Sequence, residues 1–165
     1  MRGKAEVHEE TRQLVVFKLG DEEFGVDILQ VREIERLGQG ITRVPKSPDF
    51  VEGVINLRGE IVPIVDLRKR FGLVVRAIGH ESRIVIVEVN DNQIGMMVDQ
   101  VVEVLRVPVS LIDLAPSITK GVDAFFLSGV ANIGGERLII LLDLERALSA
   151  DEVKQLNELQ AEPEV

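Results

Sequence analysis

The 165-residue sequence contains no cysteine, no tryptophan and no tyrosine, and it has only two histidines. Without cysteine there is no disulfide framework, no thiolate metal site and no cysteine nucleophile. With only two histidines, general acid–base catalysis has few of its usual groups. No apolar run approaches the roughly 20 residues that cross a bilayer, and the first residues lack the apolar core of a secretory signal. We therefore expect a cytoplasmic protein with no direct membrane insertion.

The charge of the chain argues against a nucleic-acid partner. The formal net charge is −9 at pH 7, whereas a nucleic-acid binder needs a basic surface, commonly with aromatic side chains that stack on bases. The dense basic cluster at residues 68–70 has no aromatic residues interleaved with it. We interpret this cluster as a solvated face and predict no nucleic-acid binding.

Short runs rich in valine and isoleucine, separated by turn residues, dominate the sequence. β-Branched residues favour strands, and short strands at regular spacing are typical of barrels or sandwiches. Three segments have helical patterns instead: residues 28–37, residues 66–72 and the C-terminal residues 149–165. The predicted fold class is mainly β, with short helices and a C-terminal helix and tail over 149–165.

An internal repeat runs through most of the chain. Residues 13–34 match residues 83–104 at a constant offset of 70 residues, and residues 53–60 match residues 129–136 at an offset of 76. Two matching blocks in the same order indicate a duplicated module.

Each module has the size at which a core of its own is marginal. We therefore expect the two modules to share a buried core and to form a groove at their junction. The sequence predicts a single domain over 13–148, with subdomain 1 at about 13–80 and subdomain 2 at about 81–148. The exact boundary and an exchange of terminal strands between the barrels both stay open.

Residues 53–68 carry a distinctive motif. It reads Gly53-Val54-Ile55-Asn56-Leu57-Arg58-Gly59, followed by Pro63, Asp66, Leu67 and Arg68, which is the pattern GVxNLRGxxxPxxDLR. With this motif, and with further similarity at 94–105 and 129–135, the chain resembles the CheW family of bacterial chemotaxis coupling proteins over roughly 13–148. The same module occurs in the regulatory domain of the histidine kinase CheA and in CheV-type proteins. We expect the stand-alone form, because 165 residues leave no room for kinase or receiver domains.

The resemblance implies two tandem SH3-like, five-stranded β-barrels packed together, with no enzymatic activity, no cofactor and no metal. It implies two partners: the regulatory domain of the CheA histidine kinase and the cytoplasmic helical tip of methyl-accepting chemoreceptors. The protein would be an adaptor recruited from the cytoplasm to membrane-associated receptor arrays. The alternative is a CheW-like adaptor that serves a kinase pathway outside chemotaxis.

The resemblance also assigns binding residues. Family positions associated with receptor contact correspond here to Val31, Glu33, Arg58, Gly95, Val101 and Val104, and those associated with kinase contact correspond to Ile41, Thr42 and Gly53. The second module has Gly134 where the first has Arg58, so we expect the two modules to differ in function. We expect Arg58 to lie on the receptor-facing surface within pairing distance of Glu33, and the three valines to line an apolar groove for a receptor helix.

Each assignment has a structural alternative. The three valines also fit a plain core, Glu33 with Arg58 also fits an ordinary surface ion pair of little energetic weight, and the glycines also fit turns, bulges or close backbone approach. An enzyme that uses Asp66 and Asp143 as an acid–base pair is disfavoured, because these positions are duplicated and no nucleophile or phosphate-binding loop accompanies them.

Overall fold

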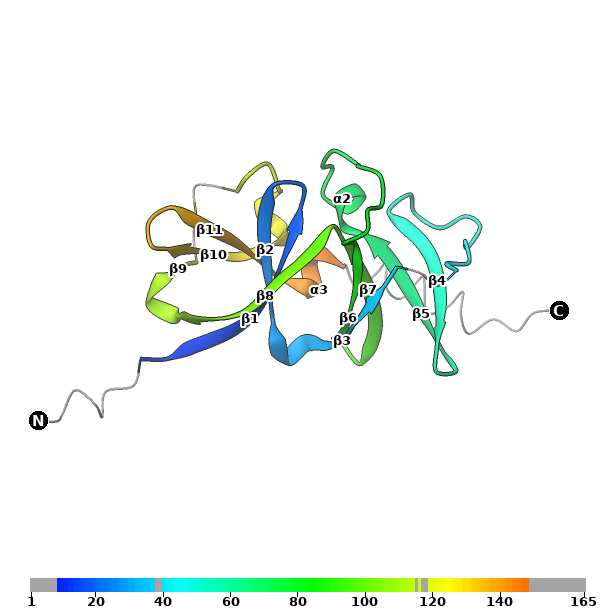
Figure 1. The fold of residues 1–165 in the computed structure, drawn as a ribbon, viewed down its shortest axis with the longest axis horizontal. Helices are drawn as coiled ribbons and strands as arrows, with labels where there is room; N and C mark the ends of the chain where they lie inside the picture. Colours follow the sequence, from blue (N-terminus) through cyan, green and yellow to red (C-terminus); the bar gives the residue numbers. More distant parts are fainter. Residues whose placement is uncertain (1–8, 38–39, 115, 117–118, 149–165) are drawn as a thin grey trace, which may run out of the picture.

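Two sheets lie side by side in the computed structural model, which describes residues 9–37, 40–114, 116 and 119–148 (Figure 1). We call them the first and the second barrel. The first barrel has the strand order β8-β1-β2-β11-β10-β9 and consists of β1 (Thr11–Leu19), β2 (Glu22–Asp27), β8 (Gln100–Pro108), β9 (Ile112–Asp113), β10 (Leu127–Ile133) and β11 (Arg137–Leu142). The second has the order β3-β6-β7-β5-β4 and consists of β3 (Val31–Arg36), β4 (Val51–Leu57), β5 (Glu60–Asp66), β6 (Arg83–Val89) and β7 (Asn92–Val98). The predicted fold class, mainly β with two barrel-like subdomains, is confirmed.

Each barrel takes strands from both copies of the sequence repeat. The first barrel combines β1 and β2 with the late strands β8 to β11, and the second combines β3, β4 and β5 with β6 and β7. The chain therefore crosses between the barrels after β2 and again after β7. The two sheets do not coincide with the sequence segments 13–80 and 81–148, because each sheet draws on both segments.

The strand pairing repeats with the sequence. β1 pairs antiparallel with β8 as β6 pairs with β3, and β2 runs parallel to β11 as β7 runs parallel to β5. Gly25 of β2 lies opposite Leu141, and the matching Gly95 of β7 lies opposite Ile64. The segments that match in sequence therefore occupy equivalent strands of two similar barrels.

Residues 28–37, predicted as a short amphipathic turn or helix, are helical only in their first three residues. They form the short 3-10 helix η1 (Ile28–Gln30) and then β3, in which half-buried and exposed side chains alternate. The amphipathic pattern of this segment also fits one face of a helix. Antiparallel pairing of β3 with β6 completes the edge of the second barrel and overrides that local pattern.

Two short α-helices begin at equivalent aspartates. Asp66 Oδ1 accepts a hydrogen bond from the backbone N–H of Arg68 at 2.9 Å before α2 (Leu67–Arg70), and Asp143 Oδ1 accepts one from Arg146 at 3.2 Å before α3 (Leu144–Ala147). Further 3-10 turns are η2 (Val109–Leu111) and η3 (Ala124–Phe126). No helix in the part of the chain that the structure describes is long and apolar enough to cross a membrane. The helix predicted within 149–165 lies outside the described residues.

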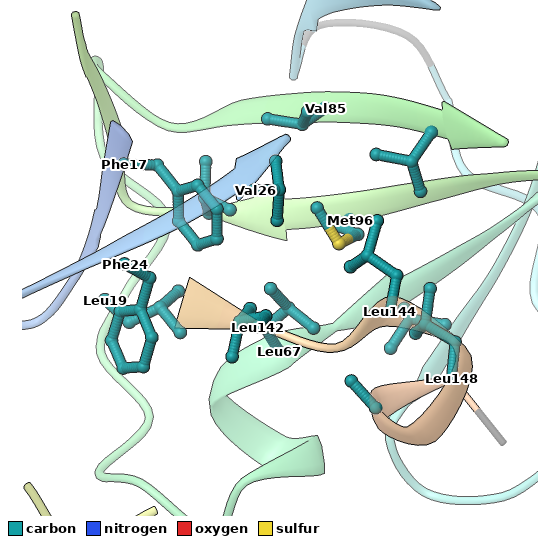
Figure 2. Packing of buried hydrophobic residues seen from close by; sticks show 14 of the residues in the cluster. Phe17, Leu19, Phe24, Val26, Leu67, Val85, Met96, Leu142, Leu144 and Leu148 are labelled. Atoms are coloured by element: carbon teal, nitrogen blue, oxygen red, sulfur yellow. The ribbon is translucent and has the colours of Figure 1, made fainter. Parts of the chain in front are cut away.

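Three apolar clusters form the interior. The largest lies between the barrels: Figure 2 shows Phe17 and Val26 of the first barrel beside Val85 and Met96 of the second. Smaller clusters lie inside each barrel. Strand β1 serves two clusters, because its alternate side chains point to opposite faces: Leu14 and Val16 into the first barrel, and Val15, Phe17 and Leu19 into the shared cluster. The modules thus share a buried core, as the sequence predicted.

Candidate protein-binding site

Arg58 lies in the tight turn between β4 and β5, where the backbone favours glycine. Its φ is +52° and that of Gly59 is +89°, and the equivalent turn between β10 and β11 has Gly134 at +67° and Gly135 at +83°. A non-glycine residue in this left-handed region costs about 1–2 kcal/mol. The turn therefore gains nothing from an arginine at position 58, and what this residue contributes must come from its side chain.

The Arg58 guanidinium pairs with Glu33 of β3. It donates from Nη1 to Glu33 Oε1 at 3.1 Å and from Nη2 to Oε2, so the contact is bidentate. The Arg58 side chain is 69% exposed, so it presents its remaining surface to solvent. This pairing agrees with the expectation from the sequence.

The charges around this pair shift the pKa values of two glutamates in opposite directions. The hydrogen bond from Arg58 holds the pKa of Glu33 below its ordinary value. The neighbouring carboxylate of Glu33 raises the pKa of Glu35 on the same strand. Two carboxylates therefore lie beside one exposed guanidinium.

The three valines differ in exposure. Val31 of β3 and Val101 of β8 are half-buried and pack against the shared core, whereas Val104 is 52% exposed. Val31 pairs with Val87 and Val101 with Phe17, at equivalent positions in the two barrels. Of the three, Val104 is the one whose apolar surface is mainly available to a partner.

Gly95 lies in the interior rather than on a surface. A Cβ atom there would lie 2.5 Å from Ile64 Cδ1 and 2.7 Å from Ile84 Cγ2. At the equivalent Gly25 the nearest side-chain atoms are farther, at 3.1 Å from Ile139 Cγ2. Gly95 can therefore act on binding only through the packing of β7, which leads directly into β8.

Ile41, Thr42 and Gly53 form one contact cluster. Thr42 and Val54 exchange backbone hydrogen bonds of 2.9 and 2.8 Å, and this bridge passes directly over Gly53. Gly53 has φ +144°, and a Cβ atom there would lie 2.1 Å from the Thr42 carbonyl oxygen and 2.9 Å from Ile41 Cγ2. Thr42 is exposed, so the outer face of this bridge is accessible.

Comparison with known proteins identifies the family. The family model described as CheW-like domain matches residues 13–152. The chain belongs to this family. It is 39% identical over 144 residues to a chemotaxis protein CheW from Klebsiella aerogenes, covering 86% of this chain and 84% of that protein. It is 36% identical over 157 residues to a chemotaxis protein CheW from Treponema pallidum, covering 93% and 91%.

A solved structure extends this similarity to three dimensions. The crystal structure of the scaffolding protein TtCheW from Thermoanaerobacter tengcongensis superposes with a TM-score of 0.80 at 37% identity, and it covers 87% of this chain and 96% of that one. This chain therefore shares its fold with a scaffolding protein and its sequence similarity with chemotaxis proteins.

A second arginine–glutamate cluster of this CheW-like domain was missed in the sequence. Glu103 of β8, the counterpart of Glu33, accepts from Arg137 Nη2 at 2.7 Å. Arg137 also pairs bidentately with Glu23, at 2.7 and 2.9 Å, and this contact lowers the pKa of Glu23. Gly134 therefore does not leave the second glutamate unpaired. The signal in the sequence was Arg137, three residues after Gly134. Whether its side chain reaches Glu103 depends on the strand register, which the sequence alone does not give.

The basic cluster 68–70 is not a solvated face, contrary to our interpretation. Arg68 is 4% exposed and is held by Asp66 at 3.0 and 3.1 Å and by Asp99 at 3.0 Å. The Arg70 guanidinium lies over two phenylalanine rings, those of Phe50 and Phe126. Helix α2 directs these side chains toward the junction between the barrels, where carboxylates and aromatic rings compensate for the loss of water.

Proposed function

We propose that this chain is a non-enzymatic adaptor that couples the cytoplasmic helical tips of chemoreceptors to the regulatory domain of the CheA histidine kinase. It would work in the cytoplasm, at membrane-associated receptor arrays. Membership of the CheW-like family supports the adaptor class. The observation that carries the proposal is Arg58, an exposed arginine held by Glu33 at a turn position that favours glycine.

The receptor side of the proposal rests on a charged and an apolar element. The planar guanidinium of Arg58 suits carboxylate and amide groups on a partner helix. Val104 offers exposed apolar surface. Val31 in β3 and Val101 in β8 are half-buried, and each of these strands directly follows a point where the chain crosses from one barrel to the other. A receptor helix bound here would contact apolar anchors and one preorganised arginine.

The kinase side rests on the bridge of Ile41 and Thr42 over Gly53. This bridge exposes Thr42, and it is fixed by two backbone hydrogen bonds. A rigid, partly exposed backbone segment is a suitable contact for a second folded domain. Separate surfaces for the two partners would allow both to bind one adaptor at once.

Co-sedimentation tests this function. A receptor cytoplasmic fragment assembled on vesicles is mixed with the chain, with and without the CheA regulatory domain. We expect the chain to pellet with the receptor fragment and to carry CheA into the pellet. Arg58→Ala should fail to pellet with the receptor fragment. Arg32→Ala is its control, because it breaks an exposed pair of the same kind, between Arg32 of β3 and Glu88. Absence of the wild-type chain from receptor pellets would contradict the proposal and favour a kinase pathway outside chemotaxis.

A further inference from the structure

The buried arginine of the second barrel has no counterpart in the first. Asp66-Leu67-Arg68 at the start of α2 is equivalent to Asp143-Leu144-Glu145 at the start of α3. In the second barrel the Arg68 side chain turns inward, where it donates to both oxygens of Asp66, to Asp99 and to the backbone carbonyl of Arg76 at 2.6 Å. In the first barrel Glu145 takes the place of Arg68, and it is exposed.

A pocket of about 260 Å³ lies at the equivalent place in the first barrel. Gly25, Gln30 and Asp143 line it, and their counterparts in the second barrel are Gly95, Gln100 and Asp66. These counterparts surround the start of α2 and the connection from β7 to β8, which is the region that Arg68 occupies. By the sequence repeat, the pocket thus lies beside the helix start at which the second barrel has its internal arginine.

The charge of the pocket is negative. Asp27, Asp143 and Glu145 contribute three carboxylates to its lining, against the guanidinium of Arg12, and Arg146 lies 3.7 Å from Asp143 Oδ2 on an exposed side chain that an incoming arginine would have to displace. Asp27 Oδ1 accepts from the backbone N–H of Leu29 at 2.9 Å, and Asp143 Oδ1 from that of Arg146 at 3.2 Å. Within the described residues, no three of the acidic or histidine side chains are grouped in a way that would hold a metal ion. The volume is slightly below the range of about 300–1,000 Å³ that ligand sites commonly have, which suits a single long side chain.

We infer that this pocket receives an arginine side chain from a partner protein. Two observations select this occupant: the charge of the lining, and the arginine that the same fold has at the equivalent helix start, with its guanidinium on the equivalent aspartate. Arginine is favoured over lysine because its planar fork matches a carboxylate bidentately, as Arg68 does on Asp66. The pocket lies on the first barrel, apart from the pair of Arg58 and Glu33, so the inference adds a contact that the proposed function does not include.

A small-molecule titration tests whether the pocket selects a guanidinium. The full chain, labelled with ¹⁵N, is titrated with N-acetyl-L-arginine amide and, in parallel, with N-acetyl-L-citrulline amide, which has nearly the same shape and no charge. We expect saturable shifts of the Gly25, Asp143 and Leu144 amide signals with the arginine probe, and at least tenfold weaker binding of the citrulline probe. Equal binding of the two probes, or no saturable shift at these residues, would overturn the inference.

The variant Glu145→Arg supplies the missing internal arginine. We expect its side chain to enter the pocket and pair with Asp143, so that the melting temperature rises and the arginine probe no longer binds. Glu136→Arg is the matched control, because it makes the same charge change at an exposed position of the first barrel, and it should keep probe binding. Unchanged probe binding in Glu145→Arg would show that the pocket is not the arginine site.

A third measurement tests whether the arginine that enters the pocket belongs to a partner protein. This test rests on the proposed function. The wild-type chain is first shown to bind the CheA regulatory domain and the receptor fragment, which separates a failure of that function from a failure of the pocket. We then expect Glu145→Arg to weaken binding to one of these two proteins at least tenfold, while Glu136→Arg does not. If both affinities are unchanged although the probe binds, the protein-borne occupant is contradicted.

Discussion

The guanidinium carbon of Arg70 lies 4.6 Å from the centre of the Phe126 ring, and this contact joins the two barrels. The same carbon lies 4.9 Å from the centre of the Phe50 ring. The two phenylalanines are equivalent, because their carbonyl oxygens accept from the capping residues Asp66 and Asp143 at 2.8 and 2.9 Å. Arg70 also donates from Nε to the carbonyl oxygen of Ala147 at 2.7 Å. One arginine thus contacts the equivalent rings of both barrels.

Loss of this stacked arginine should weaken the whole domain. We expect Arg70→Ala to lower the free energy of unfolding by about 2 kcal/mol, from lost cation–π contact and a lost hydrogen bond. Arg146→Ala is the control, since Arg146 lies 5.6 Å from the Phe125 ring and is 56% exposed. That change should cost less than about 1 kcal/mol. Urea unfolding of both variants measures the difference, and equal losses would contradict a clamp at the junction.

The two interior glycines should differ in their tolerance of a methyl group. Gly95→Ala places Cβ within 2.7 Å of two isoleucine side chains, so we expect a loss of about 1–3 kcal/mol from overpacking. Gly25→Ala should cost less, because its closest contact would be 3.1 Å. Thermal unfolding of the two variants decides the point. A Gly95→Ala protein as stable as the wild type, with receptor binding lost, would show that this glycine acts at a surface after all.

Gly53 should be far less tolerant of substitution than Gly59. An alanine at 53 would force its Cβ to 2.1 Å from the Thr42 carbonyl oxygen, so the bridge of Thr42 to Val54 must break. Gly59 also has positive φ but has open space around it, so Gly59→Ala should cost only the backbone strain of about 1–2 kcal/mol. We expect Gly53→Ala to show the larger loss in urea unfolding and to lose kinase binding through the displaced bridge. Retained kinase binding with the bridge displaced would exclude this segment from the kinase contact.

The contact of Arg137 with Glu23 should make stability depend on pH in a defined direction. A carboxyl whose pKa is lower in the folded state stabilises the protein above its ordinary pKa of 4.5, and this stabilisation is lost as the pH falls through the folded value. We expect Arg137→Gln to be less stable than the wild type by about 1 kcal/mol at pH 7, and the difference to shrink below about pH 4.5. Urea unfolding at pH 7, 5 and 3.5 measures it. A difference that grows toward low pH would contradict the assigned pairing.

The repeat in the sequence predicted the strands and their equivalence, but not how they are shared. A constant offset of 70 residues is the same whether β3 pairs within its own copy or with β6 of the other. The exchange depends on the direction in which the chain leaves β2 at Asp27, which is a property of η1 and the packed barrels. The burial of Arg68 could not be predicted from the sequence either. It requires Asp99 to lie beside α2, although Asp99 is 31 residues away in sequence. By contrast, the pair of Arg58 and Glu33 was predictable, because Arg58 lies in the motif and the family resemblance assigns Glu33 to the same face.

Binding by the Arg58→Gly variant tests the central claim most directly. Glycine is the residue that the equivalent turn already uses at position 134, so the substitution removes the guanidinium without harm to the turn. We predict an unchanged or raised melting temperature, at least a tenfold loss of affinity for the receptor fragment, and unchanged affinity for the CheA regulatory domain. A marked drop in melting temperature, or receptor binding equal to that of the wild type, would contradict the account.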